Sequence, residues 1–243
     1  MVRAGRRVAV WTAAGAVVLG GAGCGAGDRE HGDGKAGRPS ASATATGAAP
    51  LARARLIAAS FTEGERIGKY TASEYSLGVP LGENYTATPA VCQPFVSLAA
   101  GATAFTPAAE VHRRVDVPGE TLGPTVAVQL RSYPGQGAKG VMKALGRAER
   151  ACADGFTEER AVARATYPKA EPVTAPRVGD EAAAYRFTIL DVKGKLKLYE
   201  YLTVVRSGST TLSFRAEITG TRDIGGVPEE IVRAQWEKFR PER

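Results

Sequence analysis

The sequence predicts an α+β fold in which helices pack on one face of a meandering antiparallel sheet. Three observations predict this class. Several segments alternate polar and apolar residues, as strands with one buried face do. Other segments repeat apolar residues at helical spacing and carry residues typical of helix boundaries. Glycine-containing turns separate the last strands, so those strands should form antiparallel hairpins.

Residues 1–23 have the pattern of a secretory signal peptide. Three basic residues, Arg3, Arg6 and Arg7, precede the uncharged apolar run Val8 to Leu19. A membrane-spanning helix needs about 20 apolar residues, so this shorter run fits a signal peptide instead. We therefore expect export from the cytoplasm. The two adjacent arginines do not decide between the general and the twin-arginine route.

Small residues and a cysteine follow the apolar run. The segment from Leu19 to Cys24 is similar to a bacterial lipobox, in which the cysteine receives a diacylglyceryl group and becomes the new N-terminus. The alternative is an ordinary cleaved signal followed by an incidental cysteine. Each buried methylene contributes about 0.8 kcal/mol, so an acylated Cys24 would hold the protein firmly on the bilayer. We expect a lipoprotein on the extracytoplasmic face of the cell membrane.

Residues 24–50 are expected to form a flexible tether. From Gly25 to Pro50 the chain contains no Val, Ile, Leu, Met, Phe, Trp or Tyr. Without apolar surface to bury, such a segment cannot offset the entropy that ordering would cost. Residues 51–243 are long enough for one α+β domain with an apolar core.

Three helices are expected in this domain. The first begins at Thr88-Pro89 and ends at Gly101, because proline favours the first turn and glycine favours the end of a helix. The second runs from about Gly137 to Ala153. The third runs from Pro228 to Phe239, and its acidic first turn complements the helix dipole.

Cys92 and Cys152 lie on the first two of these helices. Cysteines of an exported protein are usually oxidised, so we predict one inter-helix disulfide. The two residues are far apart in sequence and lack the C-x-x-C spacing of a redox-active pair. A structural role is therefore favoured over a redox role.

The strands alternate polar and apolar residues. They are expected at Ile67–Tyr75, Glu110–Val117, Thr125–Tyr133, Ala182–Leu190, Lys195–Arg206 and Thr210–Thr219. Val192-Lys193-Gly194 is interpreted as a three-residue hairpin loop, and Ser207-Gly208 as the next turn. With these turns, one face of the last strands is apolar: Tyr185, Phe187, Ile189, Tyr199, Tyr201, Leu212, Phe214 and Ile218.

The opposite face of these strands is the candidate ligand or partner face. There the predicted register places Arg186 opposite Glu200, and Glu200 opposite Arg215, among several leucines. The alternative is a surface ion-pair network worth about 1 kcal/mol or less per pair. In that case another part of the chain covers the leucines.

Catalytic groups are scarce in the predicted domain. His31 lies in the tether, and His112 alternates with charged residues on a strand face that the pattern predicts to be exposed. Gly135 to Gly140 matches G-x-G-x-x-G, but an alternating strand precedes it and no parallel βαβ unit follows. The net charge of +7 is scattered without a basic run, which argues against nucleic-acid binding. We expect no enzyme activity, no metal and no cofactor.

Short motifs give the domain a resemblance to a known group. They are Cys92-Gln93-Pro94, Ser132-Tyr133, Ala151-Cys152-Ala153-Asp154-Gly155-Phe156, Gly179-Asp180-Glu181-Ala182, Val204-Val205-Arg206-Ser207-Gly208 and the segment Val227-Pro228 to Gln235. In these motifs the domain resembles actinobacterial lipoproteins related to the extracellular sensor domain of mycobacterial PknH-type receptor kinases. The resemblance implies an antiparallel sheet with helices, a cleft, and binding of a small extracellular ligand. Those sensor domains have two disulfides, whereas this domain can form one.

Two functions follow as hypotheses. The first is a membrane-anchored sensor-like or solute-binding domain that passes any signal to a separate partner, because no kinase domain is recognised in this chain. The second is an interaction module of the cell envelope that docks on another protein through the exposed sheet face.

Overall fold

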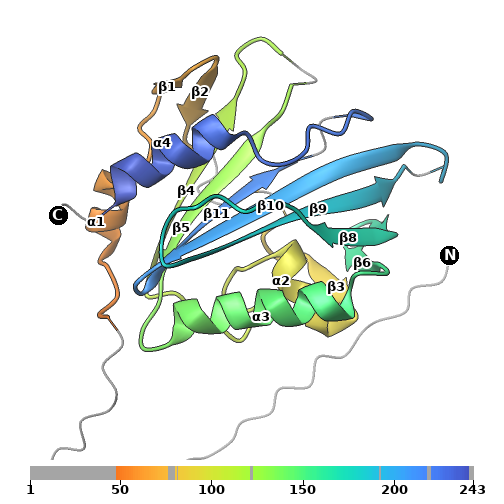
Figure 1. The fold of residues 1–243 in the computed structure, drawn as a ribbon, viewed down its shortest axis with the longest axis horizontal. Coiled ribbons are helices and arrows are strands. Elements are labelled where there is room, and N and C mark those ends of the chain that lie inside the picture. The colour runs from red at the N-terminus through yellow and green to blue at the C-terminus, as the bar shows by residue number, and fades with distance from the viewer. Residues whose placement is uncertain are drawn as a thin grey trace, which may run out of the picture. The chain divides into compact units, whose positions relative to one another are not determined.

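An eight-stranded antiparallel sheet forms the centre of this computed structural model (Figure 1), which describes residues 48–75, 80, 82–120, 123–191, 193–217 and 220–240. The chain divides into two units between Ser42 and Ala43, and all the described residues belong to the second. In spatial order the strands are β1 (Arg66–Ile67), β2 (Tyr70–Ser73), β4 (Ala109–Asp116), β5 (Val126–Ser132), β11 (Thr210–Ala216), β10 (Lys197–Ser207), β9 (Glu181–Leu190) and β8 (Lys169–Pro172).

Two meanders make up this sheet. One consists of β1, β2, β4 and β5, and the other of β8, β9, β10 and β11. They meet where β11 pairs with β5, and each pairing along the sheet is antiparallel. The predicted α+β fold with a meandering antiparallel sheet is therefore confirmed.

The remaining elements lie outside the large sheet. A small sheet contains β3 (Thr86–Thr88), β6 (Phe156–Glu159) and β7 (Arg164–Tyr167). The helices are α1 (Arg53–Ala58), the short 3₁₀ helix η1 (Ala90–Cys92), α2 (Gln93–Val96), α3 (Gly137–Ala151) and α4 (Glu229–Phe239).

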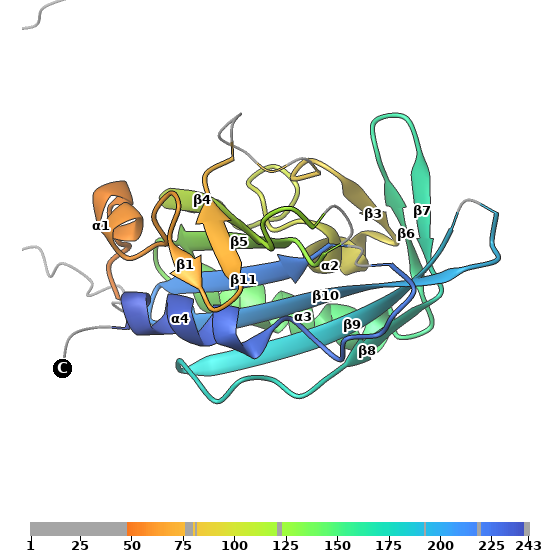
Figure 2. The same cartoon turned by 90° about the horizontal axis from the view of Figure 1, so that it is seen from above.

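Helices cover both faces of the large sheet, whereas the sequence predicts helices on one face only. We call the two sides the α3 face and the α4 face. Side chains such as Phe187 and Leu202 on the α3 face pack with α2 and α3 in one apolar cluster. Side chains such as Tyr201 and Phe214 on the α4 face pack with α1 and α4 in a second cluster. In Figure 2, α4 lies in front of the strands and α3 behind them.

The predicted disulfide between Cys92 and Cys152 is confirmed. Cys92 ends η1 and Cys152 caps the end of α3, with their Cα atoms 6.0 Å apart. Both cysteines are fully buried in the cluster on the α3 face. The bond therefore joins the two helical segments that cover this face.

The first predicted helix is much shorter than expected. Thr88 belongs to β3, and the helical segment ends at Val96 instead of continuing to Gly101. Ser97 is extended, and its hydroxyl accepts a hydrogen bond from the amide of Ala99 at 3.1 Å. This local bond gives the backbone an alternative to another helical turn. The other two predicted helices agree with α3 and α4 to within about two residues.

The predicted strand over Ile67–Tyr75 is a hairpin. Ile67 pairs with Tyr70, so β1 and β2 turn back on each other at Gly68. Gly68 has φ +57°, a left-handed conformation that favours glycine. The five other predicted strands correspond to β4, β5, β9, β10 and β11.

The register between β9 and β10 differs from the prediction by one residue. The loop spans residues 191–196, because the Asp191 carboxylate accepts hydrogen bonds from the amides of Lys195 (2.6 Å) and Leu196 (2.8 Å). A one-residue shift turns alternate side chains to the other face of the sheet. The predicted core face is therefore divided: Tyr185, Phe187 and Ile189 lie on the α3 face, and Tyr199, Tyr201, Leu212 and Phe214 lie on the α4 face.

The chain enters the domain at one end of the large sheet. The amide of Leu51 donates to the Ser132 hydroxyl at 2.8 Å, and the Ser209 hydroxyl donates to the carbonyl of Ala49 at 2.9 Å. Ser132 ends β5, and Ser209 immediately precedes β11. The first described residues are thus fixed beside the β10–β11 turn.

Several predictions lie outside the described residues. They are the signal peptide (residues 1–23), the lipidation site Cys24, residues 24–47 of the tether, His31, Val192 and Ile218. Among the described residues, no helix is both long enough and apolar enough to span a membrane.

Candidate functional site

The α3 face of the large sheet has an apolar half and a polar half. Over β9 and β10 it is mainly apolar and packs beneath the helices. Over β4, β5 and β11 it carries Glu110, His112, Gln129, Arg131, Ser213 and Arg215 at alternate strand positions. All of these except Glu110 and Arg215 are buried. The polar half is therefore enclosed by other parts of the chain.

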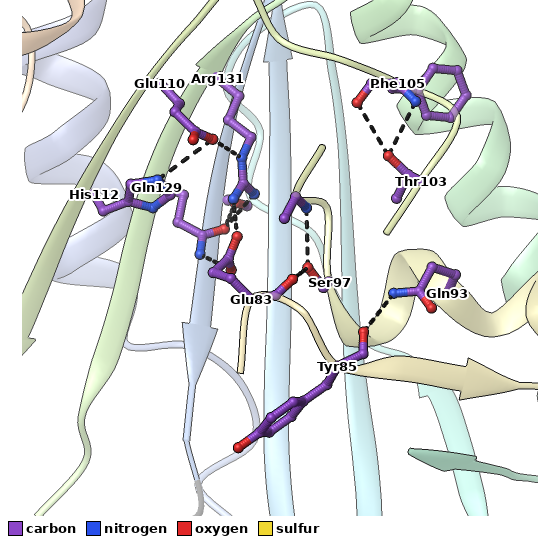
Figure 3. Close-up of polar contacts among 12 residues, drawn as sticks. Glu83, Tyr85, Gln93, Ser97, Thr103, Phe105, Glu110, His112, Gln129 and Arg131 are labelled. Atoms are coloured by element: carbon purple, nitrogen blue, oxygen red, sulfur yellow. Dashed lines mark hydrogen bonds and ion pairs between the residues drawn. The ribbon is translucent and has the colours of Figure 1, made fainter. Parts of the chain in front are cut away.

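Arg131 lies at the centre of this polar half and is fully buried. Its Nε donates to the Glu110 carboxylate at 3.0 Å, its Nη1 to Gln129 Oε1 at 2.7 Å, and its Nη2 to the Glu83 carboxylate (Figure 3). Burial alone would lower the pKa of Arg131, but the neighbouring Glu83 and Glu110 carboxylates raise it above its ordinary value. The buried guanidinium therefore stays charged and is held by carboxylates on two sides.

Glu110 also contacts His112, whose Nε2 lies 3.5 Å from a Glu110 carboxylate oxygen. The His112 imidazole, together with Arg131, lowers the pKa of Glu110 to about 2, although burial acts in the opposite direction. His112 itself is 8% exposed, so the predicted exposure of His112 is wrong, whereas Arg114 on the same strand face is exposed. Alternation of polar and apolar residues shows which strand face is polar. It does not show that another part of the chain, here the segment carrying Glu83, covers that polar face.

The segment that carries Glu83 is fixed at several points. Besides Arg131, Gln129 donates a hydrogen bond to the Glu83 carboxylate, and Ser97 donates to the Glu83 carbonyl. Gln93 accepts from the amide of Ala87 at 2.9 Å and donates to the carbonyl of Tyr85 at 3.0 Å. These contacts hold the segment above the polar half of the sheet (Figure 3).

A cavity of about 290 Å³ lies beside this fixed segment. We call it the polar cavity. Its floor comes from three strands of the large sheet, and its walls come from the Glu83 segment, α2 and the end of β6. It is lined by Pro80, Gly82, Glu83, Tyr85, Val96, Ala127, Gln129, Glu158, Arg160, Glu200, Arg215 and Glu217.

Glu200 and Glu158 reach this cavity from different sheets and share a partner. The hydroxyl of Tyr167 lies 2.5 Å from Glu158 and 3.2 Å from Glu200. Arg215 Nη1 lies 3.3 Å from the Glu200 carboxylate, and Nη2 donates to the carbonyl of Phe95. A hydroxyl has one hydrogen to donate, so both contacts are hydrogen bonds only when one of the two carboxyl groups is protonated.

The pKa of Glu200 is raised above the ordinary value of a glutamate. Glu200 is 6% exposed, and burial raises its pKa; the nearby Glu158 raises the pKa further, while Arg215 opposes the shift. Burial and the same two glutamates also raise the pKa of Tyr167 well above its ordinary value. The cavity floor therefore contains a buried carboxyl group with a raised pKa, 3.3 Å from the guanidinium of Arg215.

These buried charges are a poor way to stabilise a core. Replacing buried ion pairs by apolar residues of similar volume is often neutral or stabilising, because ions lose their hydration when buried. Perturbed, buried ionisable groups around a cavity are instead a common property of functional sites. Among the described residues no group of three or more His, Cys, Asp or Glu side chains is arranged to hold a metal ion.

A larger cleft of about 770 Å³ lies on the α4 face and is a weaker candidate. Many of its lining residues are in connecting segments, among them Val173 to Pro176 and Ile224 to Pro228. Its four charged lining residues, Lys69, Glu120, Arg222 and Glu229, are exposed. Unlike the polar cavity, this cleft has no buried charged residue in the described part of its lining.

The structure brings together two of the three sequence-predicted site residues. Glu200 and Arg215 meet on the α3 face, although Arg215 lies opposite Leu202 and not opposite Glu200. Arg186 lies on the α4 face, opposite Tyr201, and binds Glu171 at 2.8 Å and Asp223. The predicted three-residue ladder is therefore wrong, because the longer β9–β10 loop turns Arg186 to the other side.

The predicted leucine face is also divided. Leu202 and Val204 are buried in the cluster that includes α3, while Leu196 lies in the β9–β10 loop and is exposed. The sheet surface around Glu200 is thus enclosed. It does not offer the exposed apolar face on which a docking role depends.

Sequence reasoning does not identify Arg131, Glu83, Glu158, Arg160 or Tyr167 as site residues. One signal was present: Gln129 and Arg131 are polar residues inside an otherwise apolar strand. All residues of β5 are buried. A buried strand with two polar side chains on one face implies polar partners above that face.

The fold resembles two solved structures. The first is the crystal structure of the extracellular domain of PknH from Mycobacterium tuberculosis, with a TM-score of 0.50 and 14% sequence identity. The match covers 78% of this chain and 95% of that one. At this identity the likeness shows a shared fold, which confirms the structural resemblance expected from the sequence motifs.

The second is an uncharacterized protein from Mycobacterium smegmatis, the Rv0999 ortholog, with a TM-score of 0.32 and 14% identity. That match covers 70% of this chain and 81% of the other. No protein family and no curated protein sequence matches the chain.

Proposed function

We propose that this protein is a lipid-anchored extracytoplasmic lipoprotein whose sensor-like domain binds a small ligand in the polar cavity without catalysis. The observation that carries the ligand-binding part is a cavity of about 290 Å³ lined by the buried glutamates Glu158 and Glu200. Small-molecule sites are concave and contain a few fixed polar groups, as this cavity does.

The proposed location depends on the N-terminal sequence. Residues 1–23 have the pattern of a signal peptide, and Cys24 follows small residues as in a lipobox. The likeness to the PknH extracellular domain is compatible with this location. The proposal includes no catalysis because His112, the histidine of the domain, lines a different cavity from the buried glutamates.

Filling the polar cavity tests the proposal. Ala127 lies on the cavity floor, so Ala127→Leu places three extra carbon atoms in the space that a ligand would occupy. The full-length protein is screened by thermal shift against a library of extracellular metabolites and cell-wall fragments. Compounds that stabilise the wild type are expected to lose that effect in Ala127→Leu.

Ala184→Leu is the matched control, because Ala184 is also a strand residue but lines the larger cleft on the α4 face. Stabilisation should persist in this variant. Compounds that stabilise Ala127→Leu but no longer stabilise Ala184→Leu would indicate that the ligand binds in the larger cleft on the α4 face. If no compound stabilises the wild type, the small-ligand role is rejected.

A further inference from the structure

The charges of the polar cavity alternate in sign along two elements. Arg215 and Glu217 are two residues apart on and just after β11, and Glu158 and Arg160 are two residues apart on and just after β6. Residues two apart on an extended chain point to the same side. From these two elements the cavity therefore presents two arginine–glutamate pairs, in addition to Glu200 on β10 and Glu83.

Some of these charges are already neutralised inside the protein. Both Glu83 oxygens accept hydrogen bonds, from Arg131 and Gln129. Arg215 uses its two terminal nitrogens for Glu200 and the carbonyl of Phe95. These groups are set in place before any ligand arrives, and they form the fixed part of the site.

Two other charges are more accessible to a ligand. Glu217 is exposed and forms no ion pair with any residue in the described ranges. Arg160 contacts Glu158 through Nε at 2.7 Å, and its guanidinium lies 5.6 Å from the centre of the Tyr85 ring. Its side chain is 32% exposed, so a ligand can reach its terminal nitrogens.

A ligand with one sign of charge would not suit these surroundings. A simple anion at Arg160 would also meet the Glu158 carboxylate, which contacts Arg160 at 2.7 Å. A simple cation at Glu217 would lie in a cavity that Arg215, two residues earlier, also lines. Like charges placed close together at an interface are penalised, which is how a site excludes wrong ligands. A ligand that carries both charges can satisfy Arg160 and Glu217 at once.

We propose that the polar cavity binds a small zwitterion, whose carboxylate contacts Arg160 and whose ammonium group contacts Glu217. This assignment rests on the proposed ligand-binding function and names its ligand class. At about 290 Å³ the cavity is slightly smaller than most ligand pockets, which span roughly 300–1,000 Å³. That size favours a free amino acid or a dipeptide, with Tyr85, Val96 and Ala127 offering apolar surface to its carbon atoms.

The experiment compares each ligand with two derivatives that lack one charge. The full-length protein is titrated with the common L-amino acids, D-alanine and alanyl-alanine, and each binder is tested again as its N-acetyl and its C-amide form. Free zwitterions should bind, and removal of either charge should weaken binding roughly tenfold to hundredfold, as expected for a hydrogen bond to a charged group.

Two variants connect each charge to its residue. In Glu217→Gln the preference for a free over an acetylated amino group should disappear, while the preference for a free carboxylate stays. In Arg160→Gln the preference for a free carboxylate over an amide should disappear, while the preference for a free amino group stays. Arg164→Gln is the control, because Arg164 is an exposed residue of the same small sheet, pairs with Glu159 and does not line the cavity.

The outcomes separate this inference from the proposed function. If the derivatives bind as well as the free ligands, or if only other compounds bind and Ala127→Leu abolishes their binding, the zwitterion assignment is wrong and the ligand-binding function stands. If zwitterions bind equally well to Ala127→Leu, or if no compound of any class binds, both proposals are wrong.

Discussion

Arg131 shows how a single side chain fixes the polar half of the sheet. It is fully buried, and its three donor groups hold two strand residues and one residue of a connecting segment. The guanidinium and the carboxylates stabilise the fold mainly as partners of one another. A buried charge that loses its partner lowers the free energy of unfolding. Arg131 therefore holds the segment that carries Glu83, together with Gln129 and Ser97.

Arg131→Met should lower the free energy of unfolding by roughly 3–5 kcal/mol, because it leaves the Glu83 and Glu110 carboxylates without their buried partner. Urea unfolding measures the loss. Arg114→Met is the control, since Arg114 forms an ion pair with Asp116 but its side chain is 47% exposed, and the expected loss is under about 1 kcal/mol. Adding Glu83→Gln to Arg131→Met should recover part of the stability. Equal losses for the two arginines would contradict this account.

Glu200 should make stability depend on pH. Its pKa in the folded protein is raised above the value near 4.3 of an unfolded glutamate, first by burial and then by Glu158. A raised pKa contributes stability below the unfolded pKa, and this contribution is lost as the pH rises through the folded pKa. The wild type therefore loses this contribution on going from acidic to neutral pH.

Glu200→Gln removes that titration. The unfolding free energy of the variant minus that of the wild type should increase with pH, by about 1.4 kcal/mol for each unit by which folding raises the pKa. Denaturant unfolding at several values between about pH 4 and pH 8 tests this. Glu237→Gln, the same substitution at an exposed position on α4, is the control for the change of residue type. A difference that is flat or falls with pH for Glu200→Gln would show that Glu200 is ionised at little cost.

At the scale of elements, the disulfide joins two helical segments over the α3 face. Cys92 and Cys152 are 60 residues apart in sequence, and closing a loop of this length contributes about 4 kcal/mol by the chain-entropy argument. Cys92→Ala combined with Cys152→Ala should lose about that amount in chemical unfolding. A reducing agent should destabilise the wild type similarly and leave the double variant unchanged. A double variant as stable as the wild type would mean that packing alone holds these helices.

Some elements can be predicted from the sequence and others cannot. α3 and α4 have regular apolar spacing and clear boundary residues, so their limits follow from the pattern. The helix expected up to Gly101 fails because the hydroxyl of Ser97 supplies a local alternative at Val96. The small sheet is not predicted, because its strands are short and β3 is distant in sequence from β6 and β7.

The candidate site is harder to predict, since it depends on register. Asp191 lengthens the β9–β10 loop by side-chain hydrogen bonds, and one additional residue reverses which strand positions share a face. Glycine at position 194 indicates a hairpin turn but does not give the loop length. The pairing of Glu200 with Arg215 can be anticipated, whereas their contact with Glu158 and Tyr167 requires the tertiary structure.

At the scale of the whole molecule, the proposed lipid anchor at Cys24 can be tested by fractionation. If Cys24 is acylated, Cys24→Ala should move the protein from the membrane fraction to the medium, because the acyl chains supply the affinity for the bilayer. Fractionation followed by detection of the domain measures this. Unchanged fractionation would refute lipidation. As a control, Cys24→Ala should give the same thermal unfolding curve as the wild type, which would show that the substitution leaves the domain folded.

The point where the chain enters the domain has a further consequence. Ala49 and Leu51 are bound at the Ser132 and Ser209 end of the large sheet, whereas Ala127, Arg215 and Glu217 lie toward the opposite ends of the same two strands. At about 3.3 Å per strand residue, these positions are roughly 20 Å apart. The polar cavity and the point where the chain enters the domain therefore lie toward opposite ends of the sheet. A small solute can approach the cavity without contacting the residues through which the chain enters.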